Sequence, residues 1–335
     1  MDPVTHVASG LLAGRAVRDR FPPGRWIIWF AVAAAWIPDI DNFVTYLGPD
    51  AYMRIHRGLS HGLAFEALTA LVLTFVWTRF KRDAPFWPLF ILGWACQIMH
   101  SFLDVVTSYG TQILQPFSDA RVTVPVVYIV DPFFTGILLV LGAAGLLSKK
   151  YGKGLAMAGL AVIAAYPAVN LGVREYVTAS FEKALKAEGA AFDAVHVLPT
   201  AFTPLAWMAV IDAGEARMAA GFDLFHGGVG PTTPVMRRAE PALLRRLGET
   251  APIFATYAWF TDYPMLTEKS VPGGRELIFT AGRFLLLSPF LSDSWRAGPS
   301  AFSLSAVVDD AGKVVSWNFH RPGRGVEEAK AASAP

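Results

Sequence analysis

The stretch GLAMAGLAVIAAYPAVNLGV, residues 154–173, is twenty residues long and carries no charged side chain. A helix needs about 20 apolar residues to cross a bilayer, so this stretch predicts a membrane span. Working outward, uncharged runs cover residues 132–148, 84–99 and, more briefly, 26–37, while Glu66 is the sole charge in residues 62–78. Five such runs within 173 residues are too many for a soluble core to cover easily. The sequence therefore predicts a mainly α, polytopic membrane domain of about five membrane helices over residues 1–175.

The composition agrees with a lipid environment. Hydrophobic residues make up 53% of the chain and charged residues 17%, whereas soluble domains are about 25% charged. A net charge of +2 gives no support to nucleic-acid binding. The single cysteine, Cys96, excludes an intramolecular disulfide. The apolar stretch His6–Ala13 is followed by arginines instead of being led by them, so we expect no signal peptide.

After residue 174 the composition changes: 33 of 162 residues are charged, against 23 of the first 173. Stretches of β-branched, aromatic and aliphatic residues alternate with turn residues, which predicts strands at Pro252–Phe260, Glu276–Phe284 and Phe302–Val308. Asp309–Lys313 has the composition of a hairpin turn. We expect a small β-rich soluble domain over residues 195–322, followed by a disordered tail over residues 323–335.

Three basic clusters predict how the helices are oriented in the membrane. They are Arg15–Arg25, Arg79–Arg82 and Lys149–Lys153. Short loops rich in lysine and arginine favour the cytoplasm. If all three clusters are inside, the segments 39–61 and 104–131 and the whole C-terminal domain lie on the extracytoplasmic side.

Seven ionisable residues lie near the ends of the apolar runs, and this topology brings them to one membrane face: His6, Asp39, Asp41, His56, His61, His100 and Asp104. Ionisable groups at membrane depth are costly and are usually functional. His100 and Asp104 are four residues apart and share one helical face. The set exceeds the three protein ligands of a mononuclear catalytic zinc site and suits two ions. We expect one or two divalent ions, zinc in preference to manganese, with Asp39 or Asp41 as the catalytic base.

Each element also has a simpler interpretation. His6 could be an incidental surface histidine, and Asp39 and Asp41 could be solvated or helix-capping residues. His56 and His61 could be interfacial histidines without a ligand. His100 and Asp104 could form a hydrogen bond within their helix. Taken together, these simpler interpretations are less convincing than each one alone. They would require all seven residues to reach the same face of the membrane by chance.

Three further residues have candidate roles around this site. Arg57, between two proposed ligands, could bind a substrate phosphate bidentately or meet lipid headgroups. Glu66 lies about one turn inside its span and could position a ligand, act as a general acid, or be a protonated glutamate with no role. Asp131 could be a further ligand or orient a ligating imidazole.

The order of these motifs resembles that of the YdjM-like family of inner-membrane metal-dependent hydrolases. The motifs are His6, Pro38-Asp39-x-Asp41, His56-Arg57-Gly58-x-Ser60-His61 and His100-x-x-x-Asp104. The resemblance covers residues 1–175 and continues through Asp104–Ser118 and Val130–Phe133. Leu198–Trp207 is similar to the segment that opens the C-terminal part of longer family members. Gly62 stands where a serine is expected. The resemblance implies a bacterial inner-membrane location and a hydrolase.

The residue types also resemble those of zinc-dependent phospholipases C, an analogy of chemistry that favours a phosphoester substrate. We therefore expect a membrane-bound metal-dependent hydrolase that acts on a phosphoester or related ester, with membrane lipids as partners and a lipid as substrate. Two other classes stay open. The cluster could be the transit site of a metal-binding transporter, or the protein could be a structural or envelope-stress partner without hydrolase activity.

Overall fold

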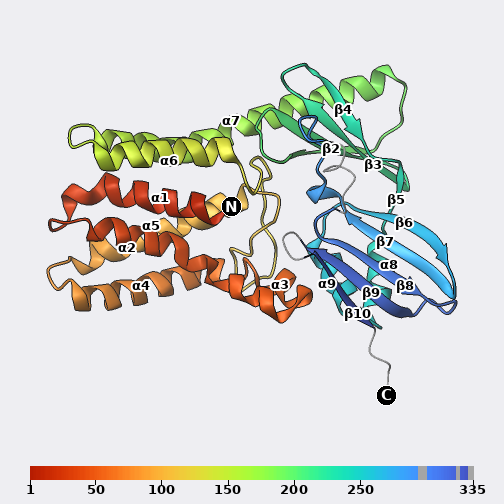
Figure 1. Cartoon of the computed structure of the whole chain (residues 1–335), viewed down its shortest axis with the longest axis horizontal. Helices are drawn as coiled ribbons and strands as arrows, with labels where there is room; N and C mark the ends of the chain where they lie inside the picture. Colours follow the sequence, from red (N-terminus) through yellow and green to blue (C-terminus); the bar gives the residue numbers. More distant parts are fainter. Residues whose placement is uncertain (293–299, 322–324, 331–335) are drawn as a thin grey trace. The chain divides into compact units, whose positions relative to one another are not determined.

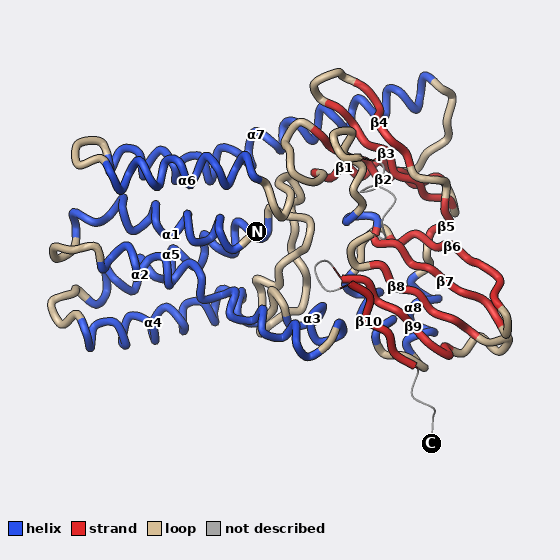
Figure 2. The backbone as a smooth tube through the Cα atoms, viewed as in Figure 1, coloured by secondary structure: helices blue, strands red, loops and turns tan. Residues whose placement is uncertain are grey.

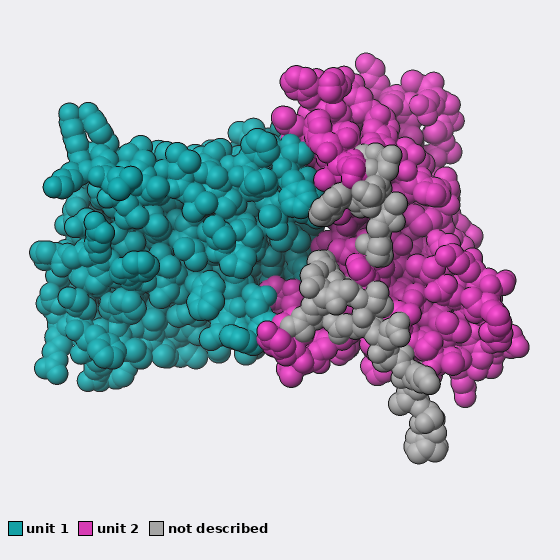
Figure 3. Space-filling model, viewed as in Figure 1, with its two compact units in different colours: residues 1–43, 57–173, 201–204 teal, residues 44–56, 174–200, 205–335 magenta. Residues whose placement is uncertain are grey.

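The computed structural model describes residues 1–292, 300–321 and 325–330. They divide into two compact units, shown in two colours in Figure 3. The helical unit comprises residues 1–43, 57–173 and 201–204. The sheet unit comprises residues 44–56, 174–200 and 205–335. The boundary at 173 lies close to the expected 175, but the sheet unit also takes in residues 44–56, which the sequence had assigned to the membrane domain.

Helices form at each of the five predicted apolar runs, and further helices lie outside these runs (Figure 1). They are α1 (Pro3–Val17), α2 (Trp26–Trp36), α3 (Pro49–Ile55), α4 (Leu63–Phe80), α5 (Phe86–Val105), α6 (Pro132–Leu147), α7 (Gly152–Ala187), α8 (Pro241–Gly248) and α9 (Ile253–Phe260). Short 3-10 segments follow α1 at Arg18–Arg20 (η1), α2 at Ile37–Leu47 (η2) and α3 at Leu59–His61 (η3).

Four segments are long and apolar enough to cross a membrane: Trp26–Leu47, Leu63–Phe80, Phe86–Val105 and Gly152–Ala187. The fifth predicted run, Pro132–Leu147, forms a helix of 16 residues, shorter than the usual span. Helix α4 exposes large apolar side chains, among them Val72 and Phe75, each more than half exposed. A soluble helix would bury such residues, so this exposure agrees with a lipid-facing helix.

Within the helical unit, α1 packs against α2, α5 and α6, and α4 packs against α5 (Figures 1 and 2). Gly10 and Gly14 lie one turn apart on α1, where small residues let two helix backbones approach closely. A Cβ added at Gly10 would lie 2.7 Å from the Ala31 carbonyl oxygen, and one at Gly14 would lie 2.7 Å from the Ile28 Cα. The pairing is antiparallel, so the start of α1 meets the end of α2.

We expect Gly10→Leu to lower the free energy of unfolding by about 1–3 kcal/mol, because the larger side chain forces α1 and α2 apart. A lower melting temperature of the detergent-solubilised protein would show it. Gly136→Leu on α6 is the matched control, since a Cβ at Gly136 meets nothing within 4 Å. Equal melting temperatures for the two variants would contradict this account of the α1–α2 contact.

The sheet unit contains one antiparallel sheet (red in Figure 2). Its strands are β1 (Ala194–Pro199), β2 (Ala206–Ala213), β3 (Ala216–Asp223), β4 (Gly228–Thr232), β5 (Met236–Arg238), β6 (Pro264–Val271), β7 (Gly274–Ala281), β8 (Ser303–Val308), β9 (Val314–Arg321) and β10 (Gly325–Lys330). Their order is β1-β2-β3-β5-β6-β7-β8-β9-β10, with β4 on β3. The predicted hairpin turn at Asp309–Lys313 joins β8 and β9 as expected.

Two local predictions for this unit differ from the structure. Pro252–Phe260 is mostly helix α9, not a strand. Its buried residues Ile253, Phe254, Tyr257 and Phe260 recur at helical spacing, and this period outweighs their strand-favouring composition. Part of the tail expected to be disordered forms β10, which pairs with β9, whereas residues 322–324 and 331–335 lie outside the described residues.

Candidate metal centre

Four predicted ligands meet inside the helical unit. Asp39 lies in η2 just after α2, His61 ends η3 just before α4, and His100 and Asp104 lie in the last turns of α5. All four are buried, and one ligand atom from each lies within 4.8 Å of the others. These four residues could therefore hold a metal ion. They are separated by up to 65 positions in the chain, and the helix ends bring them together.

The distances between these donors suit a small ion. His61 Nε2 lies 3.1 Å from His100 Nε2 and 3.1 Å from Asp104 Oδ2. His100 Nε2 lies 3.5 Å from Asp104 Oδ2 and 3.8 Å from Asp39 Oδ1. Tetrahedral zinc with bonds of about 2.0–2.2 Å places its ligands roughly 3.3–3.6 Å apart. The donor spacings of 3.1–3.8 Å lie around this range, so the four residues could hold a metal ion, with Asp39 the most distant member.

Hydrogen bonds on the far side of each ring fix which imidazole nitrogens face the centre. His100 Nδ1 donates to the Ala35 carbonyl at 2.7 Å. His61 Nδ1 donates to Ser60 Oγ at 2.9 Å, and Ser60 Oγ in turn donates to Asp41 Oδ2 at 2.7 Å. In the neutral rings, both Nε2 atoms then carry lone pairs that point at one another. A cation between them would stabilise that arrangement, as in metal sites whose histidines are oriented by a second hydrogen bond.

The two carboxylate oxygens of Asp104 have different surroundings. Its Oδ1 lies 2.9 Å from Arg57 Nη2 and also contacts the amino group of Met1. Its Oδ2 faces the two imidazoles and accepts no hydrogen bond within the described part of the chain. A buried carboxylate oxygen without a hydrogen bond is costly, so it suits a metal bond.

The electrostatics of His61 agree with this interpretation. Burial alone would lower the pKa of its imidazole, but contacts with Asp104 and Asp41 raise that pKa to about 9. The position beside Nε2 therefore attracts positive charge, whether it is a proton or a metal ion.

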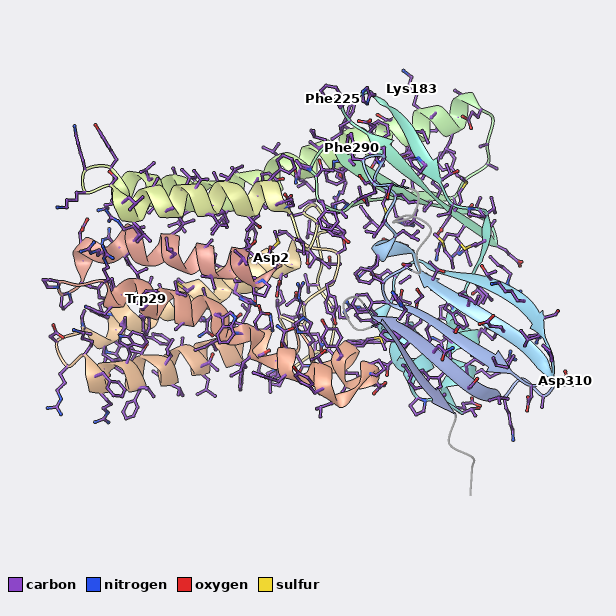
Figure 4. All side chains as sticks on the ribbon, in the orientation of Figure 1. Asp2, Trp29, Lys183, Phe225, Phe290 and Asp310 are labelled. Carbon is purple, nitrogen blue, oxygen red and sulfur yellow. The ribbon has the colours of Figure 1, made fainter. Side chains whose placement is uncertain are left out.

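His6 lies against this cluster without joining the group of four. It comes from the first turns of α1, the helix that starts beside Asp2 in Figure 4. Its ring stacks on that of His100 with centroids 3.6 Å apart, and its Nε2 lies 3.4 Å from Asp104 Oδ1. Both of its ring nitrogens are buried and have no hydrogen-bond partner among the described residues. His6 is thus a further donor in reach of Asp104.

Two of the predicted ligands have other contacts. Asp41 does not belong to the group of four: besides Ser60 it accepts from the Arg57 backbone N–H at 2.9 Å and lies 3.3 Å from His61 Nδ1. It therefore orients His61. His56 is also outside the group, and its ring stacks on Tyr52 within the sheet unit.

The predicted substrate-binding residue Arg57 is engaged instead with the cluster. Its Nη2 pairs with the Asp104 carboxylate, and its Nη1 donates to the Asp104 carbonyl at 3.2 Å and to Thr107 Oγ1 at 2.9 Å. The side chain is only 4% exposed. In this arrangement Arg57 supports Asp104, and holding a phosphate bidentately would require these bonds to break. Its predicted substrate-binding role stays a prediction.

The two residues predicted around the site are both used structurally. Glu66 Oε1 accepts from Ser101 Oγ at 2.5 Å, and Ser101 also approaches the His61 carbonyl at 3.3 Å. This contact ties α4 to α5 directly behind two ligands. Asp131 caps α6 by accepting from the backbone N–H groups of Phe133 and Phe134, each at 3.0 Å, and accepts from Tyr166 at 2.7 Å. These bonds give Asp131 a helix-capping role, and its predicted role at the metal centre stays a prediction.

The sequence pattern missed several contributors. The Ala35 carbonyl that fixes His100 is a backbone group and leaves no signal in the sequence. Ser60 and Ser101 stand beside His61 and His100 in the motifs, and their adjacency to two ligands could have marked them as orienting groups.

The fold and the cluster define a polytopic helical membrane protein that carries a buried histidine–aspartate centre and an antiparallel sheet unit. The chain belongs to the YdjM inner membrane protein family, whose model matches residues 1–178. This match includes all four residues of the centre.

Individual relatives match the same region. The chain is 30% identical over 139 residues to the uncharacterized protein YfhP of Bacillus subtilis (strain 168), covering 40% of this chain and 42% of that protein. It is 31% identical over 126 residues to the inner membrane protein YbcI of Escherichia coli (strain K12), covering 36% of this chain and 71% of that protein. The chain thus spans less than half the length of YfhP. No solved structure matches the chain significantly.

Proposed function

We propose that this protein is a membrane-bound metal-dependent hydrolase that uses one divalent ion, zinc in preference to manganese, to cleave a phosphoester of a membrane lipid. The observation that carries the proposal is the meeting of four buried donors, from Asp39, His61, His100 and Asp104, within 4.8 Å of one another. Their chemistry, two imidazoles and two carboxylates without a thiolate, is that of catalytic zinc and of phosphoesterase sites.

The residues divide into holding and reacting groups. His61, His100 and Asp104, whose donors are 3.1–3.5 Å apart, would hold the ion, and Asp41 and Arg57 would keep His61 and Asp104 in place. A bound divalent ion would polarise a phosphoryl oxygen and lower the pKa of water towards 7. Asp39 is the member farthest from the others, and at 7% exposure it is the least completely buried of the four. It is placed to accept the proton of the attacking water.

A lipid substrate is supported by the apolar surface beside the ligands. Ile40, between Asp39 and Asp41, is 57% exposed, and Phe43 is 68% exposed. Leu59 and Phe102, next to His61 and His100, are also exposed. Exposed apolar side chains at chain positions close to buried polar ligands favour a ligand with both an apolar and a charged part. We infer that the centre lies on the extracytoplasmic side, at the depth of lipid headgroups.

The experiment that tests this proposal measures phospholipid hydrolysis by the zinc-loaded and manganese-loaded protein in lipid nanodiscs. We expect Asp39→Asn to lower turnover about a hundredfold, because removal of a general base has effects of about 10²–10⁴. The variant should keep its metal, since the three closest donors are unchanged. Asp119→Asn, at an exposed loop position, is the matched control.

Two results would contradict the proposal. Wild-type turnover in metal-loaded Asp39→Asn would show that Asp39 is not the base. Absence of turnover by the metal-loaded wild type across phospholipids with different headgroups would show that the centre does not hydrolyse them.

A metal-handling role is the second candidate. The observation that favours it is that the fourth donor, Asp39, is itself a protein side chain, because four protein ligands are typical of closed, non-catalytic zinc sites. In that case metal transport into proteoliposomes would depend on His100, and no phospholipid would be cleaved.

A further inference from the structure

A second polar feature lies at the other end of the helical unit. A cavity of about 710 Å³ is lined by residues of the α1 end, η1, the following loop and the α6–α7 turn. His6 and Arg15 are nine residues apart on α1, which is about 13 Å along a helix. The cavity is therefore separate from the metal centre.

The charged lining of this cavity is strongly basic. Arg15, Arg18, Arg25 and Lys149 contribute four positive charges, and Asp19 contributes one negative charge. Among the residues that the structure describes, none of the four cations forms an ion pair. The lining therefore carries a net charge of +3. A net positive charge of this kind concentrates anions in a cleft.

One wall of the cavity is fixed by the buried Arg15. This side chain is 7% exposed, and its Nε donates to the Gly145 carbonyl at 2.8 Å, with Nη2 at 3.4 Å from the Ser148 carbonyl. These carbonyls belong to the end of α6, where no further helical N–H is available to them. Arg15 thus joins α1 to α6 and places a fixed charge at the back of the cavity, while Arg18 and Arg25 stay more exposed.

The cavity also has an apolar side. Phe21, Leu146 and Leu147 belong to its lining, and Leu147 is 84% exposed. Leu147 ends the apolar helix α6, so its exposed side chain continues the apolar surface of that helix to the cavity. A small soluble anion would use the guanidinium groups alone, whereas a phospholipid would use both the charged and the apolar parts.

We propose that this cavity binds the headgroup of an anionic phospholipid, with the phosphate held by Arg18 and Arg25 and the upper acyl chains lying against Leu146 and Leu147. Arginine matches the geometry of a phosphate group through paired N–H donors. Basic pockets between membrane helices bind anionic headgroups in this way. This end of the unit also carries two of the basic clusters that the sequence assigns to the cytoplasmic side.

The test measures lipid binding to the full-length protein in detergent by native mass spectrometry, with phosphatidylglycerol and phosphatidylcholine as probes. We expect wild type to retain one phosphatidylglycerol in preference to phosphatidylcholine. Arg18→Gln/Arg25→Gln should weaken phosphatidylglycerol binding about 25-fold, since each basic residue near an anionic lipid contributes roughly fivefold. Arg15 is left unchanged because it holds α6. A melting temperature equal to that of wild type shows that the variant is folded.

Lys150→Gln/Lys153→Gln is the matched control, because it removes two charges from the adjacent loop without touching the cavity lining. It should change phosphatidylglycerol binding by less than twofold. Equal loss in the control pair, or equal binding of phosphatidylcholine by wild type, would overturn the proposal. Full displacement of the lipid by about 10 mM inorganic phosphate would also overturn the proposal, because the cavity would then recognise phosphate alone.

Discussion

Replacing His100 by alanine is expected to remove the bound metal and to abolish turnover. His100 Nε2 lies 3.1 Å from His61 Nε2 and 3.5 Å from Asp104 Oδ2, so it is one of the three closest donors. Structural zinc sites with four ligands bind with roughly 10–16 kcal/mol, about 3 kcal/mol per ligand, so loss of one ligand weakens binding on the order of a hundredfold or more. Elemental mass spectrometry of purified protein should fall from about one metal per chain towards none.

His226→Ala is the control for this measurement. His226 lies in the sheet unit, pairs with Asp223 at 2.6 Å and is largely exposed, so its loss removes a histidine without touching the centre. The control should keep its metal. If His100→Ala retained the wild-type metal content, or wild type purified without chelators held none, the cluster would not be a metal centre. A His100→Ala/Asp104→Ala double variant, lacking two of the three closest donors, should hold no metal at all.

The sequence could predict those residues of the centre that lie at the ends of helices. His100 and Asp104 are four apart on a predicted helix, which already places them on one face, and Asp39 and His61 flank apolar runs. Since the runs cross one membrane, their ends must meet at one of two surfaces. The helical nature of the first 175 residues and a following β-rich region were predictable for the same reason: the hydrophobic pattern changes along the chain.

What sequence could not give was the course of the backbone between the helices. Arg57 adopts a positive φ of 59°, a conformation that few residues other than glycine favour. No composition rule predicts it at an arginine. This turn precedes η3, and the structure directs the Arg57 guanidinium to Asp104 while its backbone N–H binds Asp41. These contacts lie beside the centre, where the sequence had placed both residues, and they could not be read from the sequence pattern.

The order of the strands was equally out of reach of the sequence. β5 is only three residues long, yet it joins β3 to β6 and so links two parts of the sheet. Such a short segment carries no periodic pattern, and its strand character comes from its neighbours.

Replacing Arg57 by leucine is expected to destabilise the metal-free protein by about 3–5 kcal/mol. The change leaves the Asp104 carboxylate buried without its guanidinium partner, and breaking a buried pair from one side carries a penalty of this size. Arg54→Leu is the matched control three residues earlier. Its ion pair with Asp50 is about half exposed, and exposed pairs contribute at most about 1 kcal/mol.

Zinc should restore much of the stability lost in Arg57→Leu, because a divalent ion at His61 and His100 replaces the positive charge of the lost guanidinium beside Asp104. Thermal unfolding in detergent, with and without zinc, measures both effects. In the absence of zinc, Arg57→Leu/Asp104→Leu should melt above Arg57→Leu, since it removes both charges together. If zinc left the melting temperature of Arg57→Leu unchanged, Asp104 would not face the ion. If Arg57→Leu and Arg54→Leu melted alike, the buried pair would not be what holds Asp104 in place.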